Sequence, residues 1–269
     1  MEGIGKALAK AKARQKPSAG TNTESVHSAK GGLPKPELGE RKTRVEPVSQ
    51  RTLRDNRLIA GIPQEPQADL YRMLRTQVLQ RLEKSGGSTI GICSPNPGEG
   101  KTLTAANLAI ILAMDANYTV LLVDLDLRKP AVAKRFGLTL ESGLSDYLFG
   151  HTPISDCLIN PGIDRLVLLP AGSAMHNSSE ALTSPQMVSL AKEIKSRYPN
   201  RFVIYDLPPL LSSDDALVFL PHVDATLLVV REGVTRAGEI QRSIDLLKGS
   251  NFLGTVLNGS ADEDFFPYY

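Results

Sequence analysis

One stretch in the first half of the chain combines residue types that bind phosphate. It reads Ser94-Pro95-Asn96-Pro97-Gly98-Glu99-Gly100-Lys101-Thr102, lies between an apolar run at 89–93 and a helix-like stretch at 103–113, and is called the 94–102 loop below. A strand, a glycine-containing loop ending in Gly-Lys-Thr and a helix predict a phosphate cradle, lined by backbone N–H groups and the positive helix end. We expect Lys101 to reach the β- and γ-phosphates of a nucleotide and the Thr102 hydroxyl to bind Mg²⁺.

Three carboxylates follow apolar strands and supply the other half of this chemistry. Asp124 and Asp126 leave the end of the apolar run 118–123, and Asp206 ends a second run at 202–206. In doubly wound sheets, the carboxyl ends of the strands border the ligand crevice. Asp206 and Asp126 are therefore predicted to anchor the metal with Thr102. Asp124 is the candidate for orienting an acceptor hydroxyl, although Asp124 and Asp126 could exchange these roles.

Two further charged groups have open interpretations. Arg128 follows the carboxylate pair, where it could steady either carboxylate or contact a neighbouring subunit. Asp69, Arg72 and Arg75 recur at three-residue steps on a predicted helix over 69–82. They form either a solvated face with one ion pair, worth about 0.2–0.5 kcal/mol, or a surface that pairs with an identical subunit. The apolar stripe expected to bury this helix contains Leu70, Met73, Leu74, Val78 and Leu82.

Composition limits the class of protein. The chain has 269 residues, 41% of them hydrophobic, which is enough for a sizeable core in one domain. Its net charge is +2, but residues 1–60 hold 13 Lys/Arg against 6 Asp/Glu, so a basic arm precedes a mildly acidic remainder. We see no membrane-spanning run, no secretory signal, and no metal-ligand spacing among the four histidines and two cysteines. Cys93 and Cys157 are expected to be reduced and inert.

The order of predicted elements gives the domain plan. Residues 1–62 are expected to form a short basic helix at 2–15 followed by a disordered linker, with the helix either docking to a membrane surface or partner or remaining solvated. Apolar strands alternate with helices over residues 63–258, which predicts an α/β domain with a mostly parallel sheet and helices on both faces. Residues 259–269 form an acidic tail that ends in Tyr268 and Tyr269.

Together these motifs resemble the bacterial tyrosine kinases of capsular and exopolysaccharide synthesis. The resemblance runs from about Asp69 to the end of the chain. The 94–102 loop resembles their Walker A motif, residues 121–128 (Leu-Leu-Val-Asp-Leu-Asp-Leu-Arg) their Walker A′ motif, and residues 206–209 (Asp-Leu-Pro-Pro) their Walker B motif. Residues 69–75 resemble the family's E-x-x-R-x-x-R oligomerisation motif, with Asp in place of Glu. Residues 1–13 and the linker are similar to the subset associated with exosortase-linked polysaccharide loci.

The resemblance implies a P-loop NTPase fold that uses ATP and Mg²⁺. It implies autophosphorylation of Tyr268 and Tyr269 in trans, between subunits of a ring joined through Arg72 and Arg75. It further implies a cytoplasmic protein, recruited to the inner face of the membrane by a separate chain-length-determinant-like activator, with no nucleic-acid partner. The sequence departs from the family in having only two terminal tyrosines, where members usually have a larger cluster.

Two other functions compete with the kinase interpretation. The first is a ParA/MinD-like regulatory ATPase, but the position of that group's signature lysine, five residues before Lys101, holds Asn96. The second is a scaffold that binds nucleotide and organises a polysaccharide assembly complex without catalysis.

Overall fold

The computed structural model describes residues 43–62, 65, 67–197 and 200–260. All of them belong to one compact unit, residues 35–269. The helix predicted at 2–15 and the tyrosines Tyr268 and Tyr269 lie outside the described residues.

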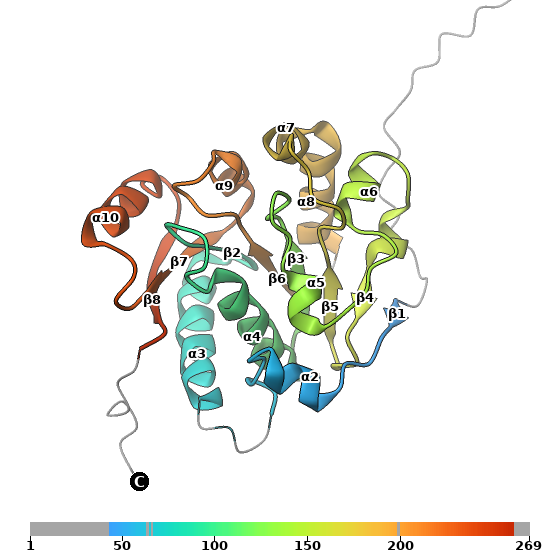
Figure 1. The fold of residues 1–269 in the computed structure, drawn as a ribbon, viewed down its shortest axis with the longest axis horizontal. Helices are drawn as coiled ribbons and strands as arrows, with labels where there is room; N and C mark the ends of the chain where they lie inside the picture. The colour runs from blue at the N-terminus through green and yellow to red at the C-terminus, as the bar shows by residue number, and fades with distance from the viewer. Residues whose placement is uncertain (1–42, 63–64, 66, 198–199, 261–269) are drawn as a thin grey trace, which may run out of the picture. The chain divides into compact units, whose positions relative to one another are not determined.

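A single eight-stranded sheet organises the unit (Figure 1). Its strands are β1 (Arg44–Val45), β2 (Thr89–Cys93), β3 (Thr119–Asp124), β4 (Ile159–Asn160), β5 (Leu166–Leu169), β6 (Arg201–Asp206), β7 (Ala225–Arg231) and β8 (Phe252–Asn258). Their order across the sheet is β1-β4-β5-β3-β6-β2-β7-β8. Every neighbouring pair is parallel except β4 and β5, so the predicted mostly parallel sheet is confirmed.

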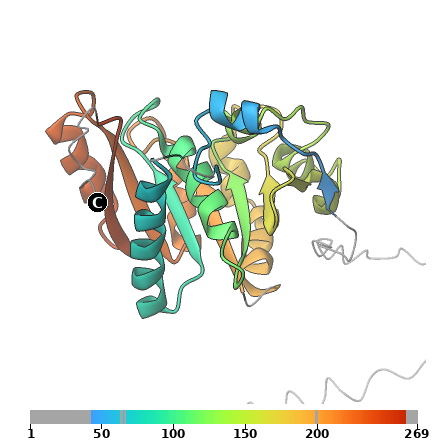
Figure 2. The same ribbon diagram turned by 90° about the horizontal axis from the view of Figure 1, so that it is seen from below.

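Helices cover both faces of the sheet (Figures 1 and 2). The α-helices are α2 (Gln50–Asp55), α3 (Ala68–Ser85), α4 (Lys101–Ala113), α5 (Val132–Phe136), α6 (Leu144–Leu148), α7 (Ser178–Thr183), α8 (Pro185–Arg197), α9 (Asp215–Phe219) and α10 (Ala237–Leu246), with 3₁₀ turns η1 (Ile154–Cys157) and η2 (Leu220–His222). Successive side chains of a strand point to opposite faces, so Val120 and Leu122 pack with α3 and α4, whereas Leu121 and Val123 pack with α6 and α8. Burial on both faces explains why the strand sequences are continuously apolar.

The register of the central strands places the site. Asp124 at the end of β3 pairs with Asp206 at the end of β6, and Ile92 of β2 pairs with the same Asp206. Strands β2, β3 and β6 therefore end side by side at one edge of the sheet. This edge carries the 94–102 loop, the carboxylates Asp124 and Asp126, and Asp206. This meeting is a direct consequence of parallel pairing.

The folded unit begins earlier than the predicted boundary at residue 63. Strand β1 pairs with β4, Leu58 and Ala60 are buried in the core on the α4 side, and Ile62 is buried as well. Buried Asn107 of α4 accepts the backbone N–H groups of Ile59 and Ala60 and donates to the carbonyl of Arg57. Residues 43–62 therefore form part of the domain and are not a linker. Their short apolar segments lack the periodicity that marks a long helix or strand.

Helix α3 buries most of the predicted apolar stripe, because Leu74 also packs against the core, but two of its five residues lie on the surface. Val78 and Leu82 are buried as expected, but Leu70 is 40% and Met73 57% exposed. Tyr71 and Leu79 pack against the core instead. The first turns of α3 therefore present part of the predicted apolar stripe to the surface.

Both cysteines are buried free thiols. Burial raises the pKa of Cys93 to about 12 and that of Cys157 to about 11, so both remain protonated at neutral pH, in line with the expected inert thiols. Across the residues that the structure describes, no helix has the length and apolar character needed to cross a membrane.

Candidate active site

The 94–102 loop leaves β2 and leads directly into α4, as the sequence predicted. Helix α4 begins at Lys101, so its first backbone N–H groups face outward without intrahelical acceptors. Gly100 precedes them at φ +104°, a conformation that residues with a side chain rarely adopt. A methyl group at Gly100 would also collide with the side-chain amide of Asn258. The loop therefore presents several N–H donors and the positive end of a thirteen-residue helix to one point.

Buried Glu99 holds the loop in shape. Its carboxylate, 1% exposed, accepts the backbone N–H of Asn96 at 2.8 Å and the hydroxyl of Thr235 at 2.7 Å. Its backbone carbonyl accepts the side-chain amide of Asn258 at 2.9 Å. Arg231 adds a further contact to the loop by donating to the carbonyl of Gly98. Arg231 ends β7, Thr235 lies in the loop after it and Asn258 ends β8, and no motif in the sequence marks them.

The contacts of Asn96 lie within the 94–102 loop, and its side chain does not extend beyond the loop. Its side-chain amide donates to the Glu99 carboxylate at 3.3 Å, so both groups of the residue serve the loop. A lysine at this position would extend a charge away from the loop, which the short amide does not do.

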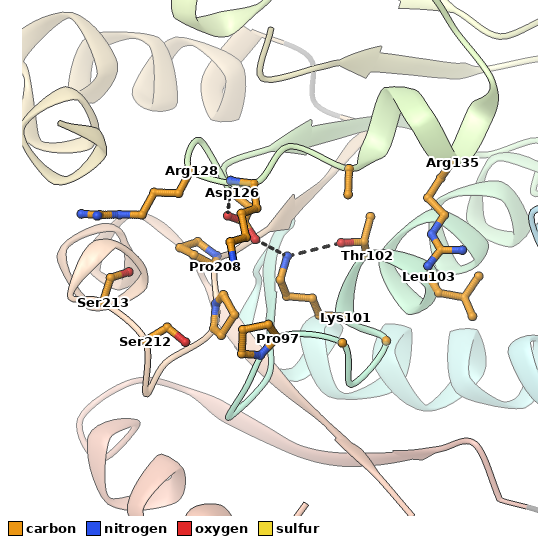
Figure 3. Close-up of a pocket in the computed structure, with 15 residues that line it drawn as sticks. Pro97, Lys101, Thr102, Leu103, Asp126, Arg128, Arg135, Pro208, Ser212 and Ser213 are labelled. Atoms are coloured by element: carbon orange, nitrogen blue, oxygen red, sulfur yellow. Dashed lines mark hydrogen bonds and ion pairs between the residues drawn. The ribbon is translucent and has the colours of Figure 1, made fainter. Parts of the chain in front are cut away.

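Lys101 lies between the carboxylates of Asp126 and Asp206 at the mouth of the loop, and Figure 3 shows its contacts with Asp126 and Thr102. Its Nζ is 2.9 Å from Asp126 Oδ2 and 3.3 Å from both Asp206 Oδ1 and Thr102 Oγ1. The Thr102 hydroxyl also donates to Asp206 Oδ2 at 2.6 Å. Lys101, Thr102 and Asp126 are 7%, 8% and 5% exposed and Asp206 is fully buried. Residues from β6, α4 and the loop after β3 thus converge in one small polar cluster.

Burial and neighbouring charges act in opposite directions on the pKa values of Lys101 and Asp206. Burial alone would lower the pKa of Lys101, but Asp206 and Asp126 beside it hold that pKa above its usual value. Burial raises the pKa of Asp206, while Lys101 and the Thr102 hydroxyl oppose the rise. The Lys101 ammonium therefore stays charged and offsets the cost of keeping carboxylates in a dry site.

Asp124 has a different environment from Asp126. Its Oδ1 accepts the N–H of Asp126 at 3.1 Å, and its Oδ2 accepts the N–H groups of Ala131 and Val132 at 3.0 and 2.9 Å. It is fully buried, and burial, with Asp206 nearby, raises its pKa to about 7. Asp124 shapes the loop between β3 and α5, whereas Asp126 lines the open pocket.

Arg128 contacts neither Asp124 nor Asp126. Its guanidinium forms a fork with the fully buried carboxylate of Asp215, at 2.9 and 3.3 Å. Ser178 donates to the same carboxylate at 2.6 Å. The pair joins the loop after β3 to α7 and α9, so the interpretation of Arg128 as a support for the neighbouring carboxylates is wrong. Asp215 was missed because an Asp at a helix start has many ordinary explanations.

A pocket of about 440 Å³ opens above the cluster. Its walls come from the 94–102 loop, from the loop after β3, and from Pro208, Pro209, Ser212 and Ser213 after β6.

The remaining predicted site residues lie on α3, away from the pocket. Exposed Arg72 pairs with Asp69, and Arg75 donates to the Ile111 carbonyl at 3.4 Å. The ion pair expected on a solvated helix face is therefore present.

The donor set of the pocket fits a nucleotide with a hard metal ion. The loop N–H groups and Lys101 suit phosphate oxygens, and the Thr102 hydroxyl with the Asp206 carboxylate offers the oxygen ligands that such a metal prefers. Among the described residues, no group of three or more His, Cys, Asp or Glu side chains could hold a metal on its own. A metal here would thus share its ligands with phosphate, as P-loop sites do. The fold and the site define a P-loop nucleotide-binding protein.

Comparison with known proteins identifies the family. Residues 87–232 match the family described as "AAA domain". The chain is 33% identical over 199 residues to the tyrosine-protein kinase YwqD of Bacillus subtilis, covering 73% of this chain and 83% of that protein. The kinase domain of the Escherichia coli tyrosine kinase ETK superposes with a TM-score of 0.71 at 28% identity, over 84% of this chain and 91% of that one. The chain belongs to the family of bacterial tyrosine-protein kinases.

Other relatives are much longer than this chain. It is 32% identical over 213 residues to the putative tyrosine-protein kinase EpsB of Ralstonia solanacearum, covering 78% of this chain but 28% of EpsB. It is also 32% identical over 208 residues to the succinoglycan biosynthesis transport protein ExoP of Rhizobium meliloti, covering 76% of this chain and 26% of ExoP. The shared region is the part that carries the nucleotide site.

Proposed function

We propose that this protein is an ATP- and Mg²⁺-dependent tyrosine autokinase that phosphorylates Tyr268 and Tyr269 in trans. The observation that carries the proposal is the convergence of Lys101, Thr102, Asp126 and Asp206 at the mouth of a phosphate-binding loop. The family supports a tyrosine hydroxyl as the acceptor. The name of ExoP supports a role in exopolysaccharide synthesis.

Each residue of the cluster has a proposed role. Lys101 and the loop N–H groups would hold the β- and γ-phosphates, and Thr102 and Asp206, with Asp126, would provide oxygen ligands for Mg²⁺. When bound, the metal supplies charge neutralisation at the phosphates. Of the two carboxylates left open by the sequence, Asp126 lines the pocket, so we assign it to orient the tyrosine hydroxyl and take its proton. Asp124 positions that loop.

The proposed reaction is a simple exchange of bonds. The bond from the γ-phosphorus to the ADP oxygen breaks, a bond from that phosphorus to the tyrosine oxygen forms, and the hydroxyl proton passes to Asp126. ADP leaves with the bonding electron pair. Placement and charge neutralisation carry the catalysis, because this step needs no covalent intermediate.

The proposal extends to assembly and location. Identical subunits would pair through the face of α3 that carries Asp69, Arg72 and Arg75, beside the exposed Leu70 and Met73. A separate membrane protein of the chain-length-determinant class would activate the kinase at the inner face of the membrane, and no nucleic acid takes part. Phosphate added to the acidic tail would loosen the ring by repulsion.

A mixing experiment tests transfer in trans. The tail root lies beside the 94–102 loop, and eleven residues span at most roughly 40 Å, so reach alone does not separate transfer in trans from transfer within one chain. Lys101→Met serves as acceptor only, and a Tyr268→Phe/Tyr269→Phe variant serves as donor only. The proposal expects phosphotyrosine on the Lys101→Met chain after mixing with Mg-ATP. Labelling that appears only in unmixed wild type contradicts transfer in trans.

A further inference from the structure

The segment between β3 and α6, which includes α5, carries a run of positive charge. Residues 128–135 include Arg128, Lys129, Lys134 and Arg135 and no Asp or Glu. Arg128, Lys129 and Arg135 line the pocket, and Lys134 does not. Among the described residues that line the pocket, Asp126 is the one carboxylate, and it is already paired with Lys101.

Most of this charge has no counterion in the structure. Arg128 is paired with Asp215, but neither Lys129 nor Arg135 forms an ion pair with any described residue. In Figure 3, Arg128 and Arg135 extend on opposite sides of the Lys101–Asp126 pair. The pocket therefore has cations beyond those that the phosphate loop itself supplies, and they flank the position of the reacting groups.

The same pocket also has an apolar wall. Pro97 of the 94–102 loop and Pro208 and Pro209 after β6 line the pocket, and Figure 3 shows Pro97 and Pro208 beside Lys101. Proline rings offer flat contact area to an aromatic ring, and no polar group of theirs is left unsatisfied by such contact. A ligand with one aromatic end and one acidic end would match both walls.

The chain carries such a segment in its own tail. Asp262, Glu263 and Asp264 precede Phe265, and Tyr268 follows four residues after Asp264. An extended stretch of four residues spans roughly 13 Å, which allows the acidic and aromatic ends to reach the two walls together. We propose that Lys129 and Arg135, with Arg128, form an acceptor subsite that binds the acidic residues 262–264 of a second copy while its tyrosine ring lies against the prolines beside Asp126.

This inference rests on the proposed kinase function and adds substrate specificity to it. Acceptors would be tyrosine segments with acidic residues on their N-terminal side. The competing assignment is that Lys129 and Arg135 bind the triphosphate of the nucleotide. In the first assignment, the affinity for the acidic peptide depends on Lys129 and Arg135. In the second, the affinity for the nucleotide depends on them.

Peptide binding to the full-length protein separates them. The probe is a fluorescent peptide of residues 259–269, compared with a neutral version carrying Asp262→Asn, Glu263→Gln and Asp264→Asn, both with saturating non-hydrolysable ATP analogue. We expect the acidic peptide to bind roughly ten-fold more tightly at low salt, and the difference to shrink as salt screens the charges. Equal affinity for the two peptides, or no binding of either, overturns the subsite.

Charge reversal provides the matched controls. Lys129→Glu/Arg135→Glu is expected to weaken acidic-peptide binding by at least ten-fold and to weaken binding of the ATP analogue by a clearly smaller factor. Lys134→Glu makes the same kind of charge change on α5 outside the pocket and is expected to change neither affinity. A peptide with lysines at 262–264 is expected to bind the double variant better than wild type. Weakened nucleotide binding with unchanged peptide binding overturns the proposal.

A transfer assay keeps the two proposals distinguishable. Charge-dependent peptide binding without any phosphate transfer from Mg-ATP contradicts the proposed kinase function and supports the subsite. Transfer at the same KM for acidic and neutral peptides supports the kinase function and overturns the subsite.

Discussion

The side-chain amide of Asn258 donates a 2.9 Å hydrogen bond to the backbone carbonyl of Glu99. Asn258 is the last residue of β8, so the end of the sheet holds the middle of the phosphate loop. The tail that carries the tyrosines therefore begins at the nucleotide site itself. This contact links loop geometry to a residue 159 positions away in sequence.

Replacing Asn258 is expected to weaken nucleotide binding. Asn258→Ala removes the contact to Glu99, so we expect a three- to ten-fold rise in the Kd for ATP and a loss of about 1 kcal/mol in the free energy of unfolding. Asn251→Ala is the control, because Asn251 makes a similar bond to the Asp224 carbonyl at the other end of β8. Calorimetric titration that finds the same ATP affinity in both variants contradicts a role for Asn258 in shaping the loop.

The segment before residue 63 is expected to contribute to stability through Asn107. Asn107→Ala leaves the buried N–H groups of Ile59 and Ala60 without acceptors, which costs about 2–4 kcal/mol in the free energy of unfolding. Urea unfolding measures the loss. Exposed Asn117 is the control, and Asn117→Ala is expected to change stability by less than about 0.5 kcal/mol. Equal effects of the two substitutions would show that residues 57–60 do not depend on this anchor.

The Arg128–Asp215 pair is expected to behave as a coupled structural unit. Arg128→Ala leaves the fully buried Asp215 carboxylate with Ser178 alone and is expected to cost about 3 kcal/mol, at the lower end for an unpaired buried charge because the Arg128 side chain is 44% exposed. Adding Asp215→Asn removes the buried charge, so the double variant is expected to be more stable than Arg128→Ala. Additive losses in a double-mutant cycle contradict direct coupling.

Asp224 gives a prediction for pH dependence. Burial alone would raise its pKa, but Lys195 and the N–H and hydroxyl donors of Ser88 and Thr89 hold that pKa below its usual value. A carboxyl with a lower pKa in the folded state stabilises that state above its unfolded pKa of about 4, and the contribution disappears as pH falls through the folded pKa. The difference in unfolding free energy between wild type and Asp224→Asn is thus expected to be full at pH 6 and to shrink below about pH 4. A difference that is constant from pH 6 to pH 3 contradicts the assignment.

Local patterns predicted the elements around the site. Apolar runs located β2, β3, β6, β7 and β8, and the Gly-Lys-Thr sequence located the start of α4. Parallel pairing then brought Asp124 and Asp206 into register. These features depend on residues close in sequence, so a periodicity argument reaches them.

Long-range partners were beyond such reasoning. Asn258, Thr235 and Asp215 act through contacts with residues far away in the chain, and each is a common surface residue type. The apolar stripe of α3 was only partly right, because Leu70 and Met73 have the right spacing but are exposed, whereas Ala68 and Tyr71 of the same turns face the core. The division of roles between Asp124 and Asp126 needed their hydrogen-bond partners, since spacing alone treats them alike.

A phosphopeptide map after incubation with Mg-ATP tests the central claim most directly. The full-length protein and its Lys101→Met variant are incubated in parallel, and mass spectrometry locates phosphate on the C-terminal peptide. Phosphate on Tyr268 or Tyr269 of wild type, with none on Lys101→Met, is the predicted result. ATP hydrolysis without phosphate on either tyrosine would contradict the autokinase and favour a regulatory ATPase.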